Sequence, residues 1–113
     1  MTNRGQAAET AAAEYLVRAG LTILQRNFRC RFGEIDLIAR DGDAVVFVEV
    51  RMRRRGDFGG AAESITGAKR ARLIKAAGFY LSSQARTPRC RFDAVLVSGP
   101  GSGVEWIRDA FGA

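Results

Sequence analysis

The chain has no histidine, no C-x-x-C pair and only two cysteines, Cys30 and Cys90, which lie far apart in the sequence. Structural zinc sites need clustered cysteine or histidine ligands, so a zinc-binding protein is not expected. A disulfide between Cys30 and Cys90 stays open at this point, although two buried, reduced thiols are the simpler interpretation.

Long apolar runs are missing as well. No segment approaches the roughly 20 consecutive apolar residues that a membrane-spanning helix needs. The stretch from Met1 to Glu14 has no long apolar part and carries early acids, unlike a signal peptide. These two absences predict a cytoplasmic protein with no membrane partner.

Acidic residues are outnumbered by basic ones. There are 18 Lys and Arg against 12 Asp and Glu, which gives a formal net charge of +6 and an isoelectric point near 10.3. Such an excess favours a polyanionic partner, and we predict nucleic acid, with DNA expected. A basic surface that binds nothing is the alternative. The length of 113 residues suits a single domain over residues 1–113.

The hydrophobic pattern predicts an α/β fold with the element order α-β-β-β-α-β-β, that is, a mixed β-sheet flanked by helices. The run at 44–50 is almost wholly apolar, which is typical of a central strand covered on both faces. Thr66 is placed to cap the second helix. The expected helices are 5–19 and 66–82, and the expected strands are 22–28, 33–40, 44–52, 92–97 and 104–107.

Two acids, Asp36 and Glu49, interrupt apolar strand runs. Burying a lone carboxylate costs free energy, so such acids are normally paired, hydrogen-bonded or bound to metal. If Asp41 and Gly42 are the central residues of a two-residue hairpin turn, Asp36 lies opposite Phe47.

In that register Glu34 lies opposite Glu49, and alternation divides the residues between two faces. The polar face holds Glu34, Asp36, Phe47, Glu49 and Arg51, and the apolar face holds Ile35, Leu37, Ala39, Val46, Val48 and Val50. Asp36 and Glu49 become diagonal neighbours roughly 7–8 Å apart. They could then share a hard cation such as Mg²⁺ or Mn²⁺. A three-residue turn would separate them, and ion pairs with nearby arginines are the alternative.

The segments Gly33-Glu-Ile-Asp36 and Phe47-Val-Glu49-Val-Arg51 resemble the YraN-like family. That family is a bacterial, nuclease-like branch of the PD-(D/E)XK superfamily, similar in fold to archaeal Holliday-junction resolvases. Other matching pieces extend the resemblance over nearly the whole chain: Gly5-x-x-x-Glu9, Asn27-Phe-Arg29, Lys69-Arg-Ala-Arg72-Leu, Arg91-Phe-Asp93 and Trp106-Ile107.

The resemblance implies a restriction-endonuclease-like core and a metal-dependent endonuclease or phosphodiesterase that acts on DNA, with branched or damaged DNA as candidate substrates. Asp36, Glu49 and the helix-borne Glu9 would be the metal ligands, with Mg²⁺ or Mn²⁺ as the cofactor. Junction-cutting relatives act as dimers, which leaves a homodimer open for this chain.

Arg51 stands where the superfamily has the lysine that helps orient or activate the attacking water, which puts it in the implied catalytic set with Asp36, Glu49 and Glu9. Arginine is always protonated, so it cannot act as a general base, although it can stabilise charge on a phosphate. The alternative function is therefore a catalytically weak or inactive nucleic-acid-binding protein on a nuclease scaffold.

Basic residues near the two acids are predicted to contact nucleic acid, and a solvated charge run is the alternative. Lys69 could instead supply the ammonium that the motif lacks, and Glu34 is either a third ligand or the partner of an arginine. Only Phe58 lies among these basic residues, so base stacking is not predicted as the main mode of binding. Association with RNA or the ribosome through charge alone is a third function. The predicted contact residues are Arg53, Arg54, Arg55, Lys69 and Arg70.

Overall fold

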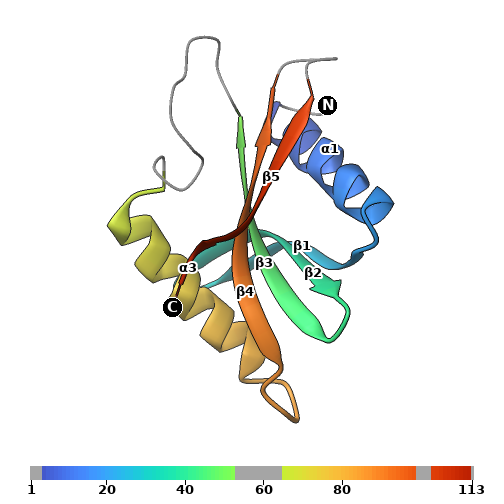
Figure 1. Cartoon of the computed structure of the whole chain (residues 1–113). Coiled ribbons are helices and arrows are strands. Elements are labelled where there is room, and N and C mark those ends of the chain that lie inside the picture. Colours follow the sequence, from blue (N-terminus) through green and yellow to red (C-terminus); the bar gives the residue numbers. More distant parts are fainter. Residues whose placement is uncertain (1–3, 53–64, 99–102, 113) are drawn as a thin grey trace.

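A five-stranded mixed sheet organises the part of the chain that the computed structural model describes, residues 4–52, 65–98 and 103–112. The strands lie in the order β1-β2-β3-β4-β5, and Figure 1 shows one helix on each side of them. This confirms the predicted α/β class and element order. The elements are α1 (Arg4–Arg18), β1 (Thr22–Cys30), β2 (Gly33–Asp41), β3 (Ala44–Met52), α3 (Gly67–Leu81), β4 (Arg89–Val97) and β5 (Val104–Phe111).

The helix α3 joins the only two parallel neighbours in the described sheet, β3 and β4. Parallel strands need a long crossover connection, whereas the antiparallel pairs β1–β2, β2–β3 and β4–β5 do not. As predicted, Thr66 caps α3, because its hydroxyl accepts a hydrogen bond of 3.2 Å from Lys69 N. The strands β1, β4 and β5 each extend beyond the predicted bounds.

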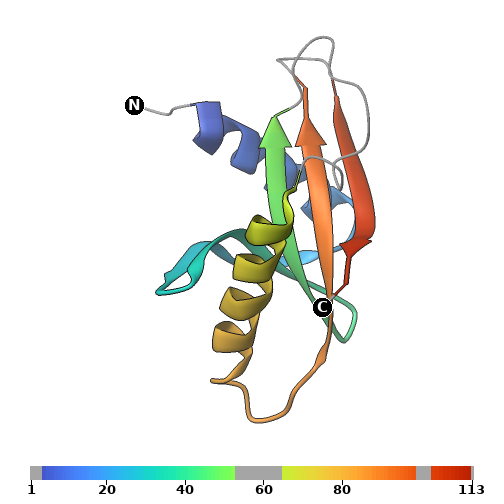
Figure 2. The same ribbon diagram turned by 90° about the vertical axis from the view of Figure 1, so that its left-hand side faces the viewer.

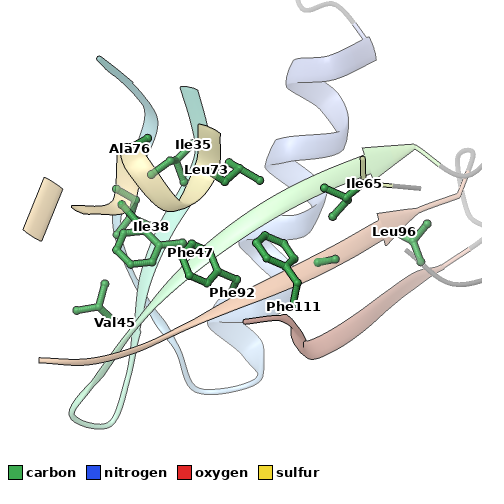
Figure 3. Packing of buried hydrophobic residues seen from close by; sticks show 12 residues of the cluster. Ile35, Ile38, Val45, Phe47, Ile65, Leu73, Ala76, Phe92, Leu96 and Phe111 are labelled. Carbon is green, nitrogen blue, oxygen red and sulfur yellow. The ribbon is translucent and has the colours of Figure 1, made fainter. Parts of the chain in front are cut away.

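The strand β3 lies between β2 and β4, and it is buried from Val45 to Glu49, which confirms the predicted central strand. Its side chains alternate between two cores, one against α3 and the other against α1. Phe47 packs in the first core with Leu73 and Phe92, as Figure 3 shows. The helices meet the sheet largely through small residues, which permits close approach: Ala12 and Ala13 of α1, and Ala76 and Ala77 of α3.

The β2–β3 hairpin has a register that differs by two residues from the predicted one. Asp41 pairs with Ala44 and Ile38 pairs with Phe47, so Gly42 and Asp43 are the central residues of the turn. Gly42 has a φ of 62°, and glycine is favoured at the first central position of a type II′ turn for this reason. The expectation that Asp36 opposes Phe47 and Glu34 opposes Glu49 was wrong, because the turn is centred one residue later.

Beyond Leu37 and Val48, the last pair of this ladder, β2 separates from β3. Figure 2 shows the tip of the β1–β2 hairpin projecting away from β3 and β4, beside α3. Ile35 therefore packs in the α3 core with Ile38, so its predicted place on the face of Leu37 was wrong. Gly33 begins β2 with a φ of 141°, and a Cβ added there would lie 3.8 Å from Arg72 Cβ.

A buried carboxylate, Asp93, links the C-terminal strands on the α1 side of the sheet. It is fully buried, and it accepts hydrogen bonds from Arg91 Nε at 3.0 Å, Trp106 Nε1 at 2.8 Å and Asp109 N at 2.9 Å. Arg91 also donates from Nη2 to Asp41 Oδ2 at 2.9 Å. Buried charges persist when they are satisfied in this way, so we assign Asp93 a structural role.

Both cysteines are free thiols, so the disulfide left open by the sequence is not formed. Cys30 is half-buried and Cys90 is exposed, which means that the expectation of two buried thiols was wrong. Neither described helix is long and apolar enough to cross a membrane.

Replacing Asp93 with alanine is expected to lower the free energy of unfolding by about 3 kcal/mol, because it leaves the Arg91 guanidinium and the Trp106 indole N–H without their buried acceptor. Urea unfolding followed by circular dichroism measures this change. Glu14→Ala removes an exposed carboxylate from α1 and should stay within about 0.5 kcal/mol of the parent protein. Equal losses in the two variants would contradict the structural role of Asp93.

Candidate metal and phosphate site

A pocket of about 170 Å³ lies where β2 leaves β3, with α3 along one side. The separation of the two strands opens it, since Asp36 and Glu49 are the next residues after the last ladder pair. Its walls bring together acids from two strands and basic side chains from the first turns of α3. The lining residues are Gly33, Glu34, Asp36, Glu49, Lys69, Arg72 and Leu73.

Three carboxylates come together where Glu34 and Asp36 line this pocket. Oxygen atoms of Glu9, Glu34 and Asp36 all lie within 4.8 Å of one another, with Glu9 contributed by α1 and not itself among the lining residues. Glu9 Oε1 is buried, and it has no hydrogen-bond partner in the described part of the chain. A buried acceptor without a partner costs about 1–3 kcal/mol, so this atom is suited to an additional ligand.

Asp36 makes one backbone hydrogen bond and lies in an electrostatic environment that disfavours its charged form. Its Oδ2 accepts a hydrogen bond of 2.9 Å from Val50 N, in place of a ladder partner. Burial raises the pKa of Asp36 from 3.8 to about 7, with a further upward contribution from the Glu49 carboxylate. The groups that shift this pKa, besides burial and the Val50 N–H, are Glu49, Glu9 and Lys69, so an arginine ion pair is not what sets it.

Glu49 is 4% exposed and forms an ion pair with Lys69, whose Nζ lies 2.7 Å from Glu49 Oε1. Lys69 belongs to the first turn of α3, and 34% of its side chain is exposed. Lys69 therefore lines the pocket with its ammonium on Glu49, while about a third of its side chain is exposed. Of the two interpretations of Lys69, the geometry favours an ammonium at the site over a wholly solvated side chain.

Glu34 is both the partner of an arginine and a member of the three-acid group, the two roles that the sequence left open. Arg29 Nε donates to Glu34 Oε2, and both side chains are well exposed. A carboxylate oxygen of Glu34 also belongs to the three-acid group. Because an exposed ion pair contributes at most about 1 kcal/mol, Glu34 can exchange Arg29 for another cation at low cost.

The pocket's donor set suits a hard cation. Among the described residues it offers carboxylate oxygens and no thiol or imidazole, which matches the ligands that Mg²⁺ and Mn²⁺ take in proteins. The three converging acids are Glu9, Glu34 and Asp36, whereas the carboxylate of Glu49 is engaged by Lys69. Glu49 remains close enough to Asp36 to raise its pKa.

Other predicted residues lie outside this pocket. Arg51 follows Glu49 by two positions in β3, and it is not among the lining residues. Arg70 donates from Nε to Ile65 O at 3.0 Å, and its guanidinium lies 5.6 Å from the centroid of the Phe111 ring. The predicted contacts Arg53, Arg54 and Arg55 lie outside the described residues.

The sequence reasoning missed Arg72 as a lining residue, although a signal for it was present. Leu73 is buried, and Lys69, Arg72 and Leu73 follow the i, i+3, i+4 spacing of one helical face. A lysine and an arginine on the edge of a buried face can reach over the sheet surface, whereas Arg70 is turned by about 100° from Lys69.

Comparison with known proteins gives the family. Residues 8–97 match the family described as "Uncharacterised protein family UPF0102". A UPF0102 protein of Nitrosomonas europaea is 57% identical over 110 residues, covering 96% of this chain and 93% of its own length. One from Methylobacillus flagellatus is 52% identical over the full length of both chains, and one from Pseudomonas putida is 49% identical over 97% of this chain. These matches confirm the YraN-like family expected from the sequence.

The pKa of Asp36 predicts how stability depends on pH. The pKa of Asp36 is about 7 in the folded protein and 3.8 in the unfolded chain. Its contribution to the free energy of unfolding is therefore fully present below pH 4, where the carboxyl is protonated in both states, and is lost as the pH rises through 7. Asp36→Asn stays neutral and can keep the hydrogen bond from Val50 N. At pH 8 it should therefore exceed the parent protein in stability by roughly 1–4 kcal/mol, since a tenfold change in proton affinity corresponds to about 1.4 kcal/mol.

Urea unfolding at pH 4 and pH 8, with a chelator present, measures this difference. Glu14→Gln, which neutralises an exposed carboxylate of α1, is the matched control and should change little between the two pH values. A gain for Asp36→Asn that is the same at both pH values would show that the carboxylate is not held in an unfavourable field.

Proposed function

The chain belongs to the UPF0102 family, and we propose that it is a metal-dependent nuclease that hydrolyses phosphodiester bonds of DNA at the acidic pocket. The family's description names no activity, so the proposal rests on the pocket itself. The proposal also covers a restriction-endonuclease-like core, a Mg²⁺ or Mn²⁺ cofactor and the placement of the chain in the PD-(D/E)XK superfamily.

The convergence of Glu9, Glu34 and Asp36, together with a buried oxygen of Glu9 that has no partner among the described residues, is the observation that carries this proposal. Like charges at such distances repel one another, and the pKa of Asp36 is raised chiefly by burial, then by the carboxylate of Glu49 and to a smaller extent by that of Glu9. A divalent cation would relieve both costs, which would account for three acids lining one pocket, with Glu9 beside two of them, in a chain with net charge +6.

The residues of the pocket divide into ligands and phosphate-binding groups. Glu9, Glu34 and Asp36 would hold the cation, and Glu49 would join them when Lys69 turns toward a phosphate oxygen. A divalent cation held there would lower the pKa of a bound water and neutralise charge on the attacked phosphate. Arg72 lines the same pocket and can bind a non-bridging phosphate oxygen.

Lys69 takes the role that the superfamily motif gives to the residue at position 51. Its ammonium lies 2.7 Å from Glu49, whereas Arg51 is not among the lining residues. An ammonium can donate to the attacking water or to the charge that develops on phosphate, and a lysine side chain can also give up a proton, which arginine cannot. The replacement of lysine by Arg51 is therefore compatible with hydrolysis.

A nucleic-acid-binding protein without catalysis is the second candidate, and the arginine at position 51 favours it. In that case the basic residues Lys69 and Arg72 would bind DNA, and the acids would be retained for structure. We propose a homodimer only for the nuclease, and only if its substrate is branched. Cutting two strands of a branched substrate requires two pockets.

Cleavage of labelled branched, single-stranded and duplex DNA in Mg²⁺ or Mn²⁺ tests the nuclease. We expect the parent protein to cut at least one of these substrates, and Glu49→Gln to lose at least about 100-fold in rate. Lys69→Ala should lose about as much in kcat, because it removes a charge-stabilising group, whereas Arg51→Ala should lose far less.

Arg86→Ala is the matched control, since it removes an exposed cation from the α3–β4 connection and should leave the rate unchanged. Circular dichroism verifies that each variant is folded. If no substrate is cut, or if Glu49→Gln cuts as fast as the parent, the nuclease proposal fails. Salt-sensitive DNA binding that persists without cleavage and survives Glu49→Gln would establish the second candidate.

A further inference from the structure

An aromatic cluster lies between the β1–β2 hairpin and the C-terminal half of α3. It consists of Phe28 and Phe32 from the hairpin and Phe79 and Tyr80 from the helix. The Phe79 ring centroid is 6.3 Å from those of both Phe28 and Phe32, and Phe28 makes an edge contact of 5.3 Å with Tyr80. These contacts hold the Phe79 ring in one place.

Phe79 is nevertheless 45% exposed. A single exposed apolar side chain is ordinary, so exposure by itself carries no function. Here the exposed ring belongs to a packed aromatic group rather than standing alone. The neighbouring Phe32 is half-buried, and the Arg31 guanidinium lies 4.9 Å from its ring centroid. The cluster thus offers an exposed, packed ring at Phe79 and a cation over the adjacent ring of Phe32, and aromatic rings with nearby cations are what bind nucleobases in single strands.

The aromatic cluster adjoins the acidic pocket through both of its elements. Phe32 directly precedes Gly33, which lines the pocket. Phe79 follows the lining residue Arg72 by seven positions, which is about two helical turns or roughly 10.5 Å along the same face of α3. Lys75 lies between them on this face and is exposed. A strand bound along this face would meet two cations and then the aromatic ring.

We propose that the aromatic cluster stacks an unpaired base of the nucleic-acid strand whose phosphate enters the acidic pocket. This inference rests on the proposed function, and it names the substrate class as DNA with unpaired nucleotides next to the cleaved bond. Bases within a duplex already stack on one another, so Phe79 can receive a base only at a strand end, a branch or a single-stranded segment. The cluster therefore provides selectivity for unpaired over base-paired nucleotides. Phosphate contacts cannot provide it, because they do not depend on whether a base is stacked.

Binding to an abasic strand separates stacking from charge. Fluorescence anisotropy would compare a labelled single-stranded DNA with an abasic strand of the same length and charge, in a chelator that prevents cleavage. We expect the parent protein to bind the base-bearing strand about tenfold more tightly, as stacking of one base on an aromatic side chain implies. Phe79→Ala should reduce the preference to near unity without weakening binding of the abasic strand.

Three further variants test whether the preference depends on an aromatic ring at position 79. Tyr15→Ala removes a ring of similar exposure, 37%, from the opposite helix α1, and it should keep the parent's preference. Phe79→Trp restores a ring and should restore the preference, whereas Phe79→Leu keeps apolar volume without a ring and should not. Phe79→Leu also serves if the alanine variant does not fold.

Equal binding of both strands by the parent protein would overturn the stacking proposal. An equal loss of preference in Tyr15→Ala and Phe79→Ala would overturn it as well. Since no step of this measurement requires cleavage, its failure leaves the nuclease proposal standing. A strand preference without any cleavage would support stacking and count against the nuclease alone.

Discussion

The crowding of carboxylates at the point where β2 leaves β3 is the constraint on which the rest of the site depends. Asp36 there uses its side chain to accept the Val50 N–H, which replaces a ladder hydrogen bond and lets the strand turn away. The same turn opens the pocket, which Lys69 of α3 lines, and leaves Asp36 near Glu9 of α1 on the other side of the sheet. Local geometry and electrostatics thus meet at one residue, since Asp36 accepts the Val50 N–H, lines the pocket and lies beside the other acids.

The two apolar cores make this unfavourable arrangement tolerable. Phe47 and Leu73 on the α3 side, and Leu16 and Val48 on the α1 side, are almost fully buried and fix both helices against the sheet. Burial of such side chains stabilises a fold by about 1.5–3 kcal/mol each. This offsets the free-energy cost of the Asp36 carboxylate, whose pKa is raised, and of the unpartnered oxygen of Glu9. Proteins commonly keep destabilised groups where they bind ligands, and the acidic pocket fits this description. Asp93 shows the contrast, because its carboxylate is more deeply buried than those of Asp36 and Glu9 but is fully hydrogen-bonded.

Much of the fold followed from the sequence, because periodicity and turn residues act locally. The apolar run of β3 predicted a central strand, and Thr66 predicted the start of α3. The register of β2 and β3 did not follow, since Asp41-Gly42 and Gly42-Asp43 are both plausible turn centres and tertiary packing decides between them. Lys69 was a candidate but its partner was unknown, because an ion pair between a helix and a strand depends on how α3 crosses the sheet. The aromatic cluster was invisible for the same reason: Phe32 and Phe79 are 47 positions apart and meet only in the fold.

The central claim is that Glu9, Glu34 and Asp36 form a binding site for a divalent cation. Anomalous diffraction from a crystal soaked in Mn²⁺ tests it most directly, because it locates the metal without requiring turnover. We expect an anomalous peak bonded to oxygens of these three acids at roughly 2.0–2.3 Å, and its loss in a crystal of Asp36→Asn. A map without a peak in the pocket, or with a peak that persists unchanged in Asp36→Asn, would contradict the claim.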